Sequence, residues 1–352
     1  MSADKDSEAR ASQATIKPQP INAEKKPRAS IVIGVHNRWP ALKDCLDSLR
    51  LMAFKPFEVV VVDDASTSSI SEMVEEYRAS HPELQIQLIR NEKNLGAAGA
   101  RNRGVSIARG EFVCFTDSDC TVDEYWLTNL LKPLEDAEIG AVSGRVVDVQ
   151  PRNWAERAHA GVSSYGRKSG NLIEGNMAIR HSIMESIGFD DALVYGGEGD
   201  DLAKRLKASG WRSAFEPQAL VIHNHPMTIS SYLRRGFHQG RGSARYWYKH
   251  DIFIGRDLAS LALAALSLPL AALDSRLLIL PLFFLALQLA LLLFNELFFK
   301  GKRLGEALMV LPLVSAFYAC RASGVFLTLG RILIGSERDI VDSKRSWKQS
   351  KV

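Results

Sequence analysis

The sequence predicts an α/β fold with a doubly wound, mostly parallel sheet, followed by a C-terminal α-helical membrane region. Two observations carry this prediction. From residue 30 onward, short β-branched apolar runs alternate with helical patterns, as in βα units that build a parallel sheet. Beyond about Asp257 the chain changes to long apolar stretches that are almost free of charge.

The expected strands of the first half are short and apolar enough to be buried on both faces. They cover residues 30–35, 58–62, 84–89 and 112–116, and helical patterns follow from Pro40, Ile70 and Gly96. The pattern is less regular from residue 138 to about 226. There, strands are expected at 140–149, 172–180 and 219–222, and helices at 182–187 and 201–208.

Composition excludes several classes of protein. The chain has 352 residues, of which 24% are charged and 46% hydrophobic, as in an ordinary globular protein. Its net charge of +4 and the lack of a basic stripe interleaved with aromatics argue against a nucleic-acid partner. The four cysteines lie far apart without a CxxC pair, which favours reduced thiols in a cytosolic compartment over a zinc site.

The two ends of the chain differ in character. Residues 1–29 are polar, contain three prolines and lack a signal-peptide core, so we expect a disordered tail and a following domain on the cytosolic side. Residues 258–273 and 277–299 are apolar runs separated by Asp274-Ser275-Arg276. The second has about 23 residues, roughly 34 Å as a helix, which is enough to span a bilayer. A hairpin through the cytoplasmic (inner) membrane is therefore predicted, the alternative being a buried core hairpin.

Basic residues indicate the orientation of this hairpin. Arg256 precedes it and Lys300, Lys302 and Arg303 follow it, which places both ends in the cytosol. A third run, 307–320, is interrupted by Arg321 and is interpreted as an interfacial or re-entrant helix, with a third span as the alternative. The expected division is a disordered tail (1–29), an α/β domain (30–235), a basic aromatic juxtamembrane segment (236–257), a membrane hairpin with an interfacial or third membrane helix (258–335) and a basic cytosolic tail (336–352).

Paired carboxylates follow two of the expected strands, at the edge where ligands bind in such sheets. Asp117 and Asp119 are one residue apart after a buried strand, repel each other and indicate a divalent cation such as Mg²⁺ or Mn²⁺, although such a pair also occurs in ordinary turns. Asp63 and Asp64 can accept hydrogen bonds from a base or ribose. The alternative is that Asp64, Ser66 or Thr67 caps the next helix.

Small residues open the helical pattern that begins at Gly96. They would let the backbone approach a ligand, and Arg101 would pair with a phosphate or base; tight helix–sheet packing is the alternative. The sequence lacks both a Gly-x-Gly-x-x-Gly turn after the first strand and a Walker loop. Nicotinamide cofactors and P-loop chemistry are therefore disfavoured.

Together these segments resemble, in order and spacing, the family 2 glycosyltransferases. The resemblance covers about residues 30–226 and is carried by Val35-His36-Asn37, Val62-Asp63-Asp64-Ala65-Ser66, Asn94-Leu95-Gly96 with Ala100-Arg101-Asn102, and Asp117-Ser118-Asp119. It implies the GT-A fold, a nucleoside-diphosphate sugar donor that is often a UDP-sugar, and inversion at the anomeric carbon. It also implies a nucleotide-sugar-binding set of Val35, Asn37, Asp63, Asp64, Asn94, Gly96, Arg101, Asp117 and Ser118.

The resemblance extends to the metal and to the acceptor side. It implies Asp117, Asp119 and His223 as metal ligands, with a structural histidine as the alternative at 223. Gly175 and Asn176 lie in a segment that resembles the acceptor side of the family. The acidic stretch Gly196–Leu202 resembles the motif Glu-Asp-x-Asp-Leu that supplies a general base.

This acidic stretch departs from the family pattern. When Glu198 is placed on the motif's glutamate, Gly199 falls on its usual catalytic aspartate. We therefore rank Asp200 first as the base, Glu198 second and Asp201 third. A helix start decorated with acids is the alternative.

The expected function is metal-dependent transfer of one sugar from a nucleotide sugar to a lipid-linked or membrane-proximal glycan acceptor, in cell-surface glycan assembly. The Gln-x-x-Arg-Trp motif of processive synthases is absent: the nearest residues are Gln239-Gly240-Arg241-Gly242, so polymerisation is disfavoured. A basic, aromatic stretch around Arg234–Trp247 would close over the diphosphate or lie on anionic headgroups. The alternatives are a processive polysaccharide synthase and a non-catalytic nucleotide-sugar sensor in the membrane.

Overall fold

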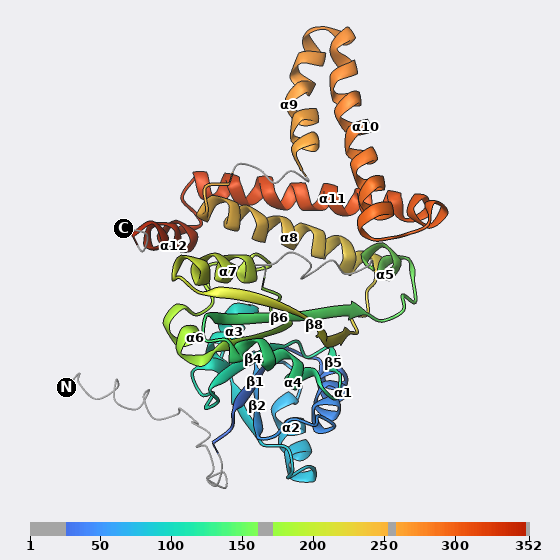
Figure 1. Ribbon diagram of the computed structural model, residues 1–352. Coiled ribbons are helices and arrows are strands. Elements are labelled where there is room, and N and C mark those ends of the chain that lie inside the picture. Colours follow the sequence, from blue (N-terminus) through green and yellow to red (C-terminus); the bar gives the residue numbers. More distant parts are fainter. Residues whose placement is uncertain (1–25, 161–171, 253–257, 350–352) are drawn as a thin grey trace, which may run out of the picture.

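The computed structural model of the protein describes residues 26–160, 172–252 and 258–349 (Figure 1). Most of the predicted N-terminal tail, residues 1–25, lies outside the described residues, as do parts of the juxtamembrane segment and the last three residues. Among the described residues, strands form one sheet in the order β3-β2-β1-β4-β7-β6-β8-β5. The strands are β1 (Ala29–Val35), β2 (Phe57–Asp63), β3 (Ile86–Arg90), β4 (Phe112–Thr116), β5 (Cys120–Val122), β6 (Ile139–Asp148), β7 (Asn176–Arg180) and β8 (Arg212–His223).

The first half of the sheet is parallel, as predicted. β1 lies between β2 and β4, and all seven residues of both β1 and β2 are buried or nearly so, which is why these segments are continuous apolar runs. The second half is mixed, because β7 runs antiparallel to β4 and β6, and β5 runs antiparallel to β8. The predicted α/β sheet is therefore confirmed, with antiparallel pairs confined to its second half.

Helices cover both faces of the sheet. One face packs against α1 (Trp39–Arg50), α2 (Ile70–Ser80) and α4 (Trp126–Leu131), which continues into a 3₁₀ turn at Lys132–Glu135. The other face packs against α3 (Gly96–Val105), α6 (His181–Ile187) and α7 (Glu198–Ala208). A short helix, α5 (Trp154–His159), lies beyond β6. Most boundaries agree with the sequence, but β8 begins seven residues before the predicted 219, and α7 begins at Glu198 instead of 201.

Two long helices lie side by side above the sheet domain: α8 (Ile229–Lys249) and α11 (Leu304–Leu333) (Figure 1). They approach closely because glycines face the partner backbone. A side chain at Gly240 would collide with the Arg321 carbonyl, and one at Gly324 with the Phe237 carbonyl. The expected domain boundary at 235/236 falls inside the continuous helix α8. The last helix, α12 (Arg338–Gln349), is formed by the expected basic tail and buries Ile340 and Trp347.

The predicted hairpin is present as α9 (Ala259–Leu273) and α10 (Ile279–Phe294), joined by a 3₁₀ turn at Ser275–Leu278 and continued by a π-helical turn at Asn295–Phe299. It projects away from the sheet domain, whereas α11 runs across its base (Figure 1). Within the described residues, two helices are long and apolar enough to cross a membrane, 275–299 and 304–333. Only 17% of the apolar window in the first is buried, so its side chains lack a protein core to pack against, which suggests association with a membrane.

Candidate active site

The turn between β4 and β5 brings two acidic residues to the edge of the sheet. The Cys120 N–H donates to the Asp117 carbonyl at 3.1 Å, which closes the turn. β5 then pairs with β8 so that Cys120 lies opposite His223, and the Asn224 N–H donates to the Asp119 carbonyl at 2.8 Å. This register places Asp119 beside the histidines that end β8, although more than 100 residues separate them.

Asp119 is the centre of this group and is only 7% exposed. Its Oδ2 lies 2.6 Å from Arg38 Nη1 and 2.8 Å from His225 Nδ1, and its Oδ1 lies 3.4 Å from His223 Nε2. Burial alone would raise the pKa of Asp119, but the histidines and Arg38 hold it well below its usual range. Burial alone would lower the pKa of His223, but Asp119 and Asp148 raise it to about 9.

Asp117 lies on the other side of the turn. Arg101 Nη2 donates to its Oδ1 at 2.8 Å, and Gly175 approaches so closely that an added Cβ would lie 2.5 Å from Oδ2. Ser118, between the two acids, is buried.

The described residues hold two groups of donor atoms whose members lie within 4.8 Å of one another. One joins Asp119 to His223 and His225, and the other joins Asp117 to Asp119 and Cys120. Carboxylate oxygens are the ligands that Mg²⁺ and Mn²⁺ prefer, and a metal ion would replace the guanidinium groups of Arg38 and Arg101 that now pair with Asp119 and Asp117. The residues therefore fit a divalent cation, with His225 as a further donor that the sequence prediction did not include.

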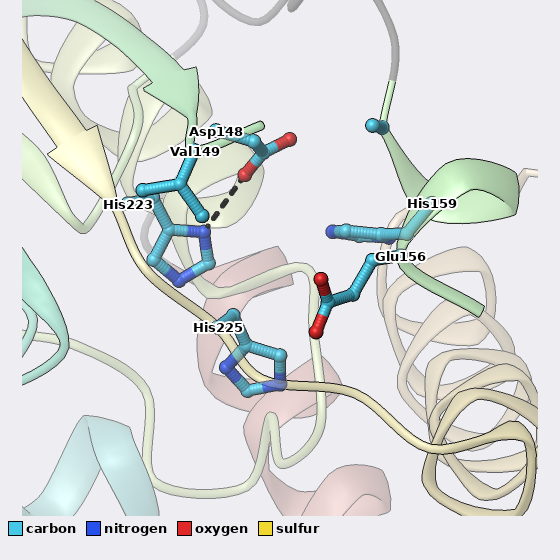
Figure 2. A pocket seen from close by; sticks show the side chains of 7 residues that line it. Asp148, Val149, Glu156, His159, His223 and His225 are labelled. Atoms are coloured by element: carbon cyan, nitrogen blue, oxygen red, sulfur yellow. Dashed lines mark hydrogen bonds and ion pairs between the residues drawn. The ribbon is translucent and has the colours of Figure 1, made fainter. Parts of the chain in front are cut away.

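A small pocket of about 20 Å³ lies between the two histidines on one side and Glu156 and His159 of α5 on the other (Figure 2). His223 Nδ1 is 3.1 Å from Asp148 Oδ1 on one wall, and His159 from α5 lies opposite it. Burial and Arg235 lower the pKa of His159 to about 3, so this ring is neutral at physiological pH. The ion pair with Asp148 orients His223 toward Asp119, in the way that outer carboxylates orient metal-binding histidines.

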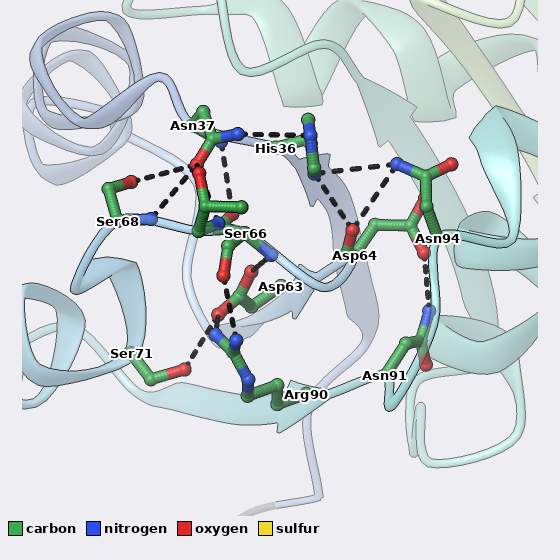
Figure 3. Close-up of polar contacts among 11 residues, drawn as sticks. His36, Asn37, Asp63, Asp64, Ser66, Ser68, Ser71, Arg90, Asn91 and Asn94 are labelled. Carbon is green, nitrogen blue, oxygen red and sulfur yellow. Dashed lines mark hydrogen bonds and ion pairs between the residues drawn. The ribbon is translucent and has the colours of Figure 1, made fainter.

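The acid pair after β2 forms a different kind of network (Figure 3). Asp64 accepts the N–H groups of Leu95 at 2.8 Å and Gly96 at 3.0 Å, together with the Asn91 amide at 2.9 Å. Asn94 Oδ1 also accepts the Gly96 N–H at 3.1 Å. Asp64 therefore holds the loop that opens α3.

Asp63 has no exposed surface. Its carboxylate accepts the Ser66 N–H at 2.9 Å and the Ser71 hydroxyl at 2.8 Å and pairs with Arg90. Burial alone would raise the pKa of Asp63, but these partners lower it. α2 begins after Ser69 without a side-chain cap, so the alternative that Asp64, Ser66 or Thr67 caps this helix is wrong.

Residues at the end of β1 complete this loop cluster. Val35 is buried and its carbonyl accepts the Asp64 N–H at 2.8 Å. Asn37 Oδ1 accepts the N–H groups of Thr67 and Ser68 at 2.8 and 3.0 Å. His36 Nδ1 lies 2.9 Å from the Asp64 carbonyl. The structure thus gathers the predicted nucleotide-binding residues of three loops into one hydrogen-bonded edge.

A third acidic pair consists of Glu198, the first residue of α7, and Glu174, just before β7. Glu198 is 7% exposed, and burial together with the nearby Glu174 raises its pKa to about 7. Burial likewise raises the pKa of Glu174. Arg101 interacts electrostatically with both glutamates and with Asp117, which connects this pair to the metal-binding turn.

Gly199 explains the departure from the family motif. A side chain there would collide with the Leu172 carbonyl, and its Cβ would lie 2.7 Å from the carboxyl carbon of Glu174. Glu174 Oε1 instead accepts the Gly199 N–H at 2.5 Å. The carboxylate of Glu174 therefore occupies the space that a side chain at position 199 would need.

The other two predicted acids have different surroundings. Asp200 is exposed beside Lys204 and His250. Asp201 is fully buried, and its oxygens lie 2.6 to 2.8 Å from Lys249, His250 and Arg205. Burial alone would raise the pKa of Asp201, but the hydrogen bond with His250 and the charges of Arg205 and Lys249 lower it to about 2. Asp201 thus fastens α7 to α8.

Asn176 from the predicted acceptor side is also engaged within the fold. It is fully buried, accepts the Trp126 indole N–H at 2.8 Å and donates to the carbonyls of Arg145 and Ala219 at 3.0 and 2.9 Å.

Sequence reasoning did not single out Arg38, Asp148 or Glu174. No local signal marks Arg38 or Asp148, whereas Glu174 stands beside Gly175 in the segment that resembles the acceptor side of the family.

Comparison with known proteins agrees with this geometry. Residues 30–190 match the family model described as Glycosyl transferase family 2. The chain is similar to the pre-mycofactocin glycosyltransferase of Mycobacterium tuberculosis (strain ATCC 25618 / H37Rv), with 28% identity over 245 residues, 66% of this chain and 50% of that protein. The matched region thus spans half the length of that relative. It is also 26% identical over 243 residues to glycosyltransferase AglE of Haloferax volcanii, covering 66% of this chain and 78% of that protein.

Among solved structures, the chain is similar to the mannosyltransferase PcManGT from Pyrobaculum calidifontis in complex with GDP-Man and Mn²⁺. The TM-score is 0.54 at 20% identity, with 95% of this chain and 88% of that chain covered. This likeness shows the GT-A type of fold. The fold and the family match point to sugar transfer as the chemistry of this class of domain. The match to glycosyltransferase family 2 is confined to residues 30–190, less than half of the chain, and does not include β8.

Proposed function

We propose that the protein is a metal-dependent, inverting glycosyltransferase that moves one sugar from a nucleoside-diphosphate sugar to a lipid-linked or membrane-proximal acceptor. The observation that carries this proposal is the convergence of Asp117, Asp119, His223 and His225 at one edge of the sheet. Mg²⁺ or Mn²⁺ held there would act as a Lewis acid toward the leaving diphosphate. Arg38 and Arg101 would move from the carboxylates to phosphate oxygens.

The donor would lie along the loops at the ends of β1 and β2. Asn37, Asn94 and Gly96 line this edge, while Asp63 and Asp64 fix its shape. We favour a uridine nucleotide because the family resemblance does. Guanosine is the first competitor to assay, since the mannosyltransferase of similar fold is in complex with GDP-Man.

Glu198 is our choice of general base, ahead of Asp200. Inversion requires an acceptor hydroxyl to attack the anomeric carbon while the bond to the diphosphate breaks, and the hydroxyl proton must go to a base. A base is most effective when its pKa is close to the working pH, and the pKa of Glu198 is about 7. Burial raises the pKa of Asp200 as well, but this side chain is exposed beside Lys204, whose charge acts in the opposite direction. Asp201 is paired with Lys249 and Arg205.

Membrane attachment would bring the acceptor to this site. We propose that α9 and α10 enter the inner membrane with the catalytic domain on the cytosolic side, and that α11 lies in the interface. The crosswise position of α11 supports this arrangement (Figure 1). So do Lys300 and Lys302, which pair with the buried Glu296 at the base of the hairpin. Cell-surface glycan assembly is the process that such a location favours.

The test is release of free nucleotide by the full chain in detergent, assayed with a panel of UDP-, GDP- and dTDP-sugars with Mn²⁺ or Mg²⁺. One donor should be turned over, EDTA should abolish turnover and added metal should restore it. Undiminished turnover in excess chelator would contradict metal dependence. Failure of every donor to bind would contradict the proposed function itself.

A further inference from the structure

One face of α8 carries a row of basic side chains. Arg234, His238, Arg241 and Arg245 are spaced at i, i+4, i+7 and i+11, which places them on the same side of a helix. Arg245 is neutralised, because it pairs with Glu337 and, at 2.9 Å, with Asp339. The structure gives Arg234 and Arg241 no carboxylate partner among the residues it describes.

The side chain of Tyr195 gathers part of this row into a cluster. Its ring stacks on His238 with centroids 4.4 Å apart, and the guanidinium of Arg241 lies 5.0 Å from the same ring. Arg241 Nε and His238 Nδ1 are buried, and neither has a hydrogen-bond partner within the described part of the chain. Buried polar atoms of this kind ordinarily have partners, and leaving one unpaired costs about 1–3 kcal/mol.

Burial, Arg241 and Arg234 lower the pKa of His238. The two arginines therefore act on the histidine as uncompensated positive charge. An anion placed among the three side chains would relieve this repulsion and satisfy the unpaired donors. We call Arg234, His238, Arg241 and Tyr195 the α8 cationic site.

The location of the site connects it to catalysis. Tyr195 directly precedes Gly196 and Gly197, and Glu198 begins α7 immediately afterwards. The Tyr195–Gly196 backbone packs against α8 so closely that a Cβ at Gly242 would lie 2.7 Å from the Gly196 carbonyl. Tyr195 holds a φ of 73°, which a residue with a side chain adopts only when its surroundings impose it. α8 itself lies between the sheet domain and the apolar hairpin (Figure 1).

We propose that the α8 cationic site binds the phosphate or diphosphate that joins a lipid-linked acceptor to its lipid. The lipid would extend toward α9 and α11, and the acceptor hydroxyl would reach Glu198. This inference rests on the proposed function, since it presupposes a lipid-linked acceptor. The donor diphosphate is assigned elsewhere, to Asp117 and Asp119, so the two phosphate groups of the reaction have separate positions.

The test measures binding of farnesyl diphosphate to the full chain in detergent by calorimetry, with farnesol and inorganic pyrophosphate as partial probes. R241Q should weaken farnesyl diphosphate binding about 10- to 100-fold, as expected for loss of charge-assisted hydrogen bonds. R234Q removes an exposed charge and should weaken it less without a risk to folding. R345Q is the matched control, because Arg345 is 74% exposed on α12 and should have no effect.

Wild-type affinity for farnesyl diphosphate in both R241Q and R234Q would overturn the proposal. Equal binding of farnesol and farnesyl diphosphate to the wild type would also overturn it. Binding to phosphatidylglycerol vesicles is measured as well: if the variants lose only this binding, the site is a surface for lipid headgroups and the proposal is wrong. Binding of UDP or GDP with Mn²⁺ is measured in parallel and should be the same in R241Q. If the wild type binds neither UDP nor GDP, the result counts against the proposed function and not against this site.

Discussion

Two pairs of acidic residues in this protein have opposite surroundings. Asp63 and Asp64 are buried, yet their oxygens accept hydrogen bonds from serines, backbone N–H groups and Arg90. Glu174 and Glu198 are also withdrawn from water, and burial raises the pKa of both, with a further rise at Glu198 from the nearby charge of Glu174. Burial alone would raise the pKa of Asp63, Glu174 and Glu198, so the hydrogen-bond partners of Asp63 decide the difference.

The difference in surroundings indicates that one pair stabilises the fold and the other takes part in the reaction. A carboxylate whose oxygens are all satisfied stabilises the loop that surrounds it and has little tendency to take up a proton. A desolvated carboxylate beside a second one is destabilised in its charged form and is ready to accept a proton near neutral pH. We infer that the first pair shapes the donor edge and that the second carries proton transfer.

The largest expected effect is on the second pair. E198Q should lower transfer about 10²–10⁴-fold, the usual loss when a general base is removed. Donor binding should survive, because Glu198 does not touch the loops at the ends of β1 and β2. Steady-state rates with D200N as the matched comparison check this. A large loss in D200N with normal rates in E198Q would return the role to Asp200.

The second largest effect is expected at the metal-binding turn between β4 and β5. D119N is expected to lower donor turnover about 10²–10³-fold, because charge stabilisation of the leaving group is lost. Calorimetric Mn²⁺ binding in the presence of the nucleotide should weaken in parallel. D44N, an exposed acid on α1, is the control and should behave as the wild type. Normal metal binding in D119N would contradict the assignment.

The first pair should affect stability more than rate. D63N weakens the buried hydrogen bonds of this carboxylate with Ser66, Ser71 and Arg90 and should cost about 1–3 kcal/mol of unfolding free energy. In the wild type, the stabilisation by Asp63 is present above its ordinary pKa and is lost as the pH falls through the lowered value. Thermal denaturation of the purified chain measures both effects. An unchanged melting temperature with abolished nucleotide binding would make Asp63 a direct ligand instead.

The smallest expected effect is that of Glu174 on the pH dependence of the rate. Its charge helps to raise the pKa of Glu198, so E174Q should shift the acid limb of the pH–rate profile to lower pH. A residue with only a packing role would change the maximal rate and leave the limb in place. E185Q, at an exposed position on α6, is the matched control.

Much of the fold was predictable because buried parallel strands are continuous apolar runs. β4 was predicted at Phe112–Thr116 and occurs there. β8 begins earlier than predicted because residues 212–218 mix polar and apolar side chains and none of them is buried, so a continuous apolar pattern does not mark them. The predicted hairpin depended on the same kind of signal, two leucine-rich runs around a charged turn.

The site was predictable only where its residues are adjacent in the sequence. Asp117 and Asp119 follow a strand and were recognised from that position. His225 lies as close to Asp119 as it does because Cys120 pairs with His223, a register that no local pattern reports. In the same way, Gly199 and Glu174 meet across 25 residues, so the sequence showed a missing aspartate but not the carboxylate that takes its place.

The most direct test of the contrast between the two acidic pairs is the dependence of kcat/KM on pH for the wild type and E198Q. A base accepts a proton only when it is deprotonated, so wild-type kcat/KM should be constant above a midpoint of about 7 and fall tenfold per pH unit below it. E198Q should be slow and lack this limb. A limb at the same midpoint in E198Q would contradict the assignment of proton transfer to Glu198.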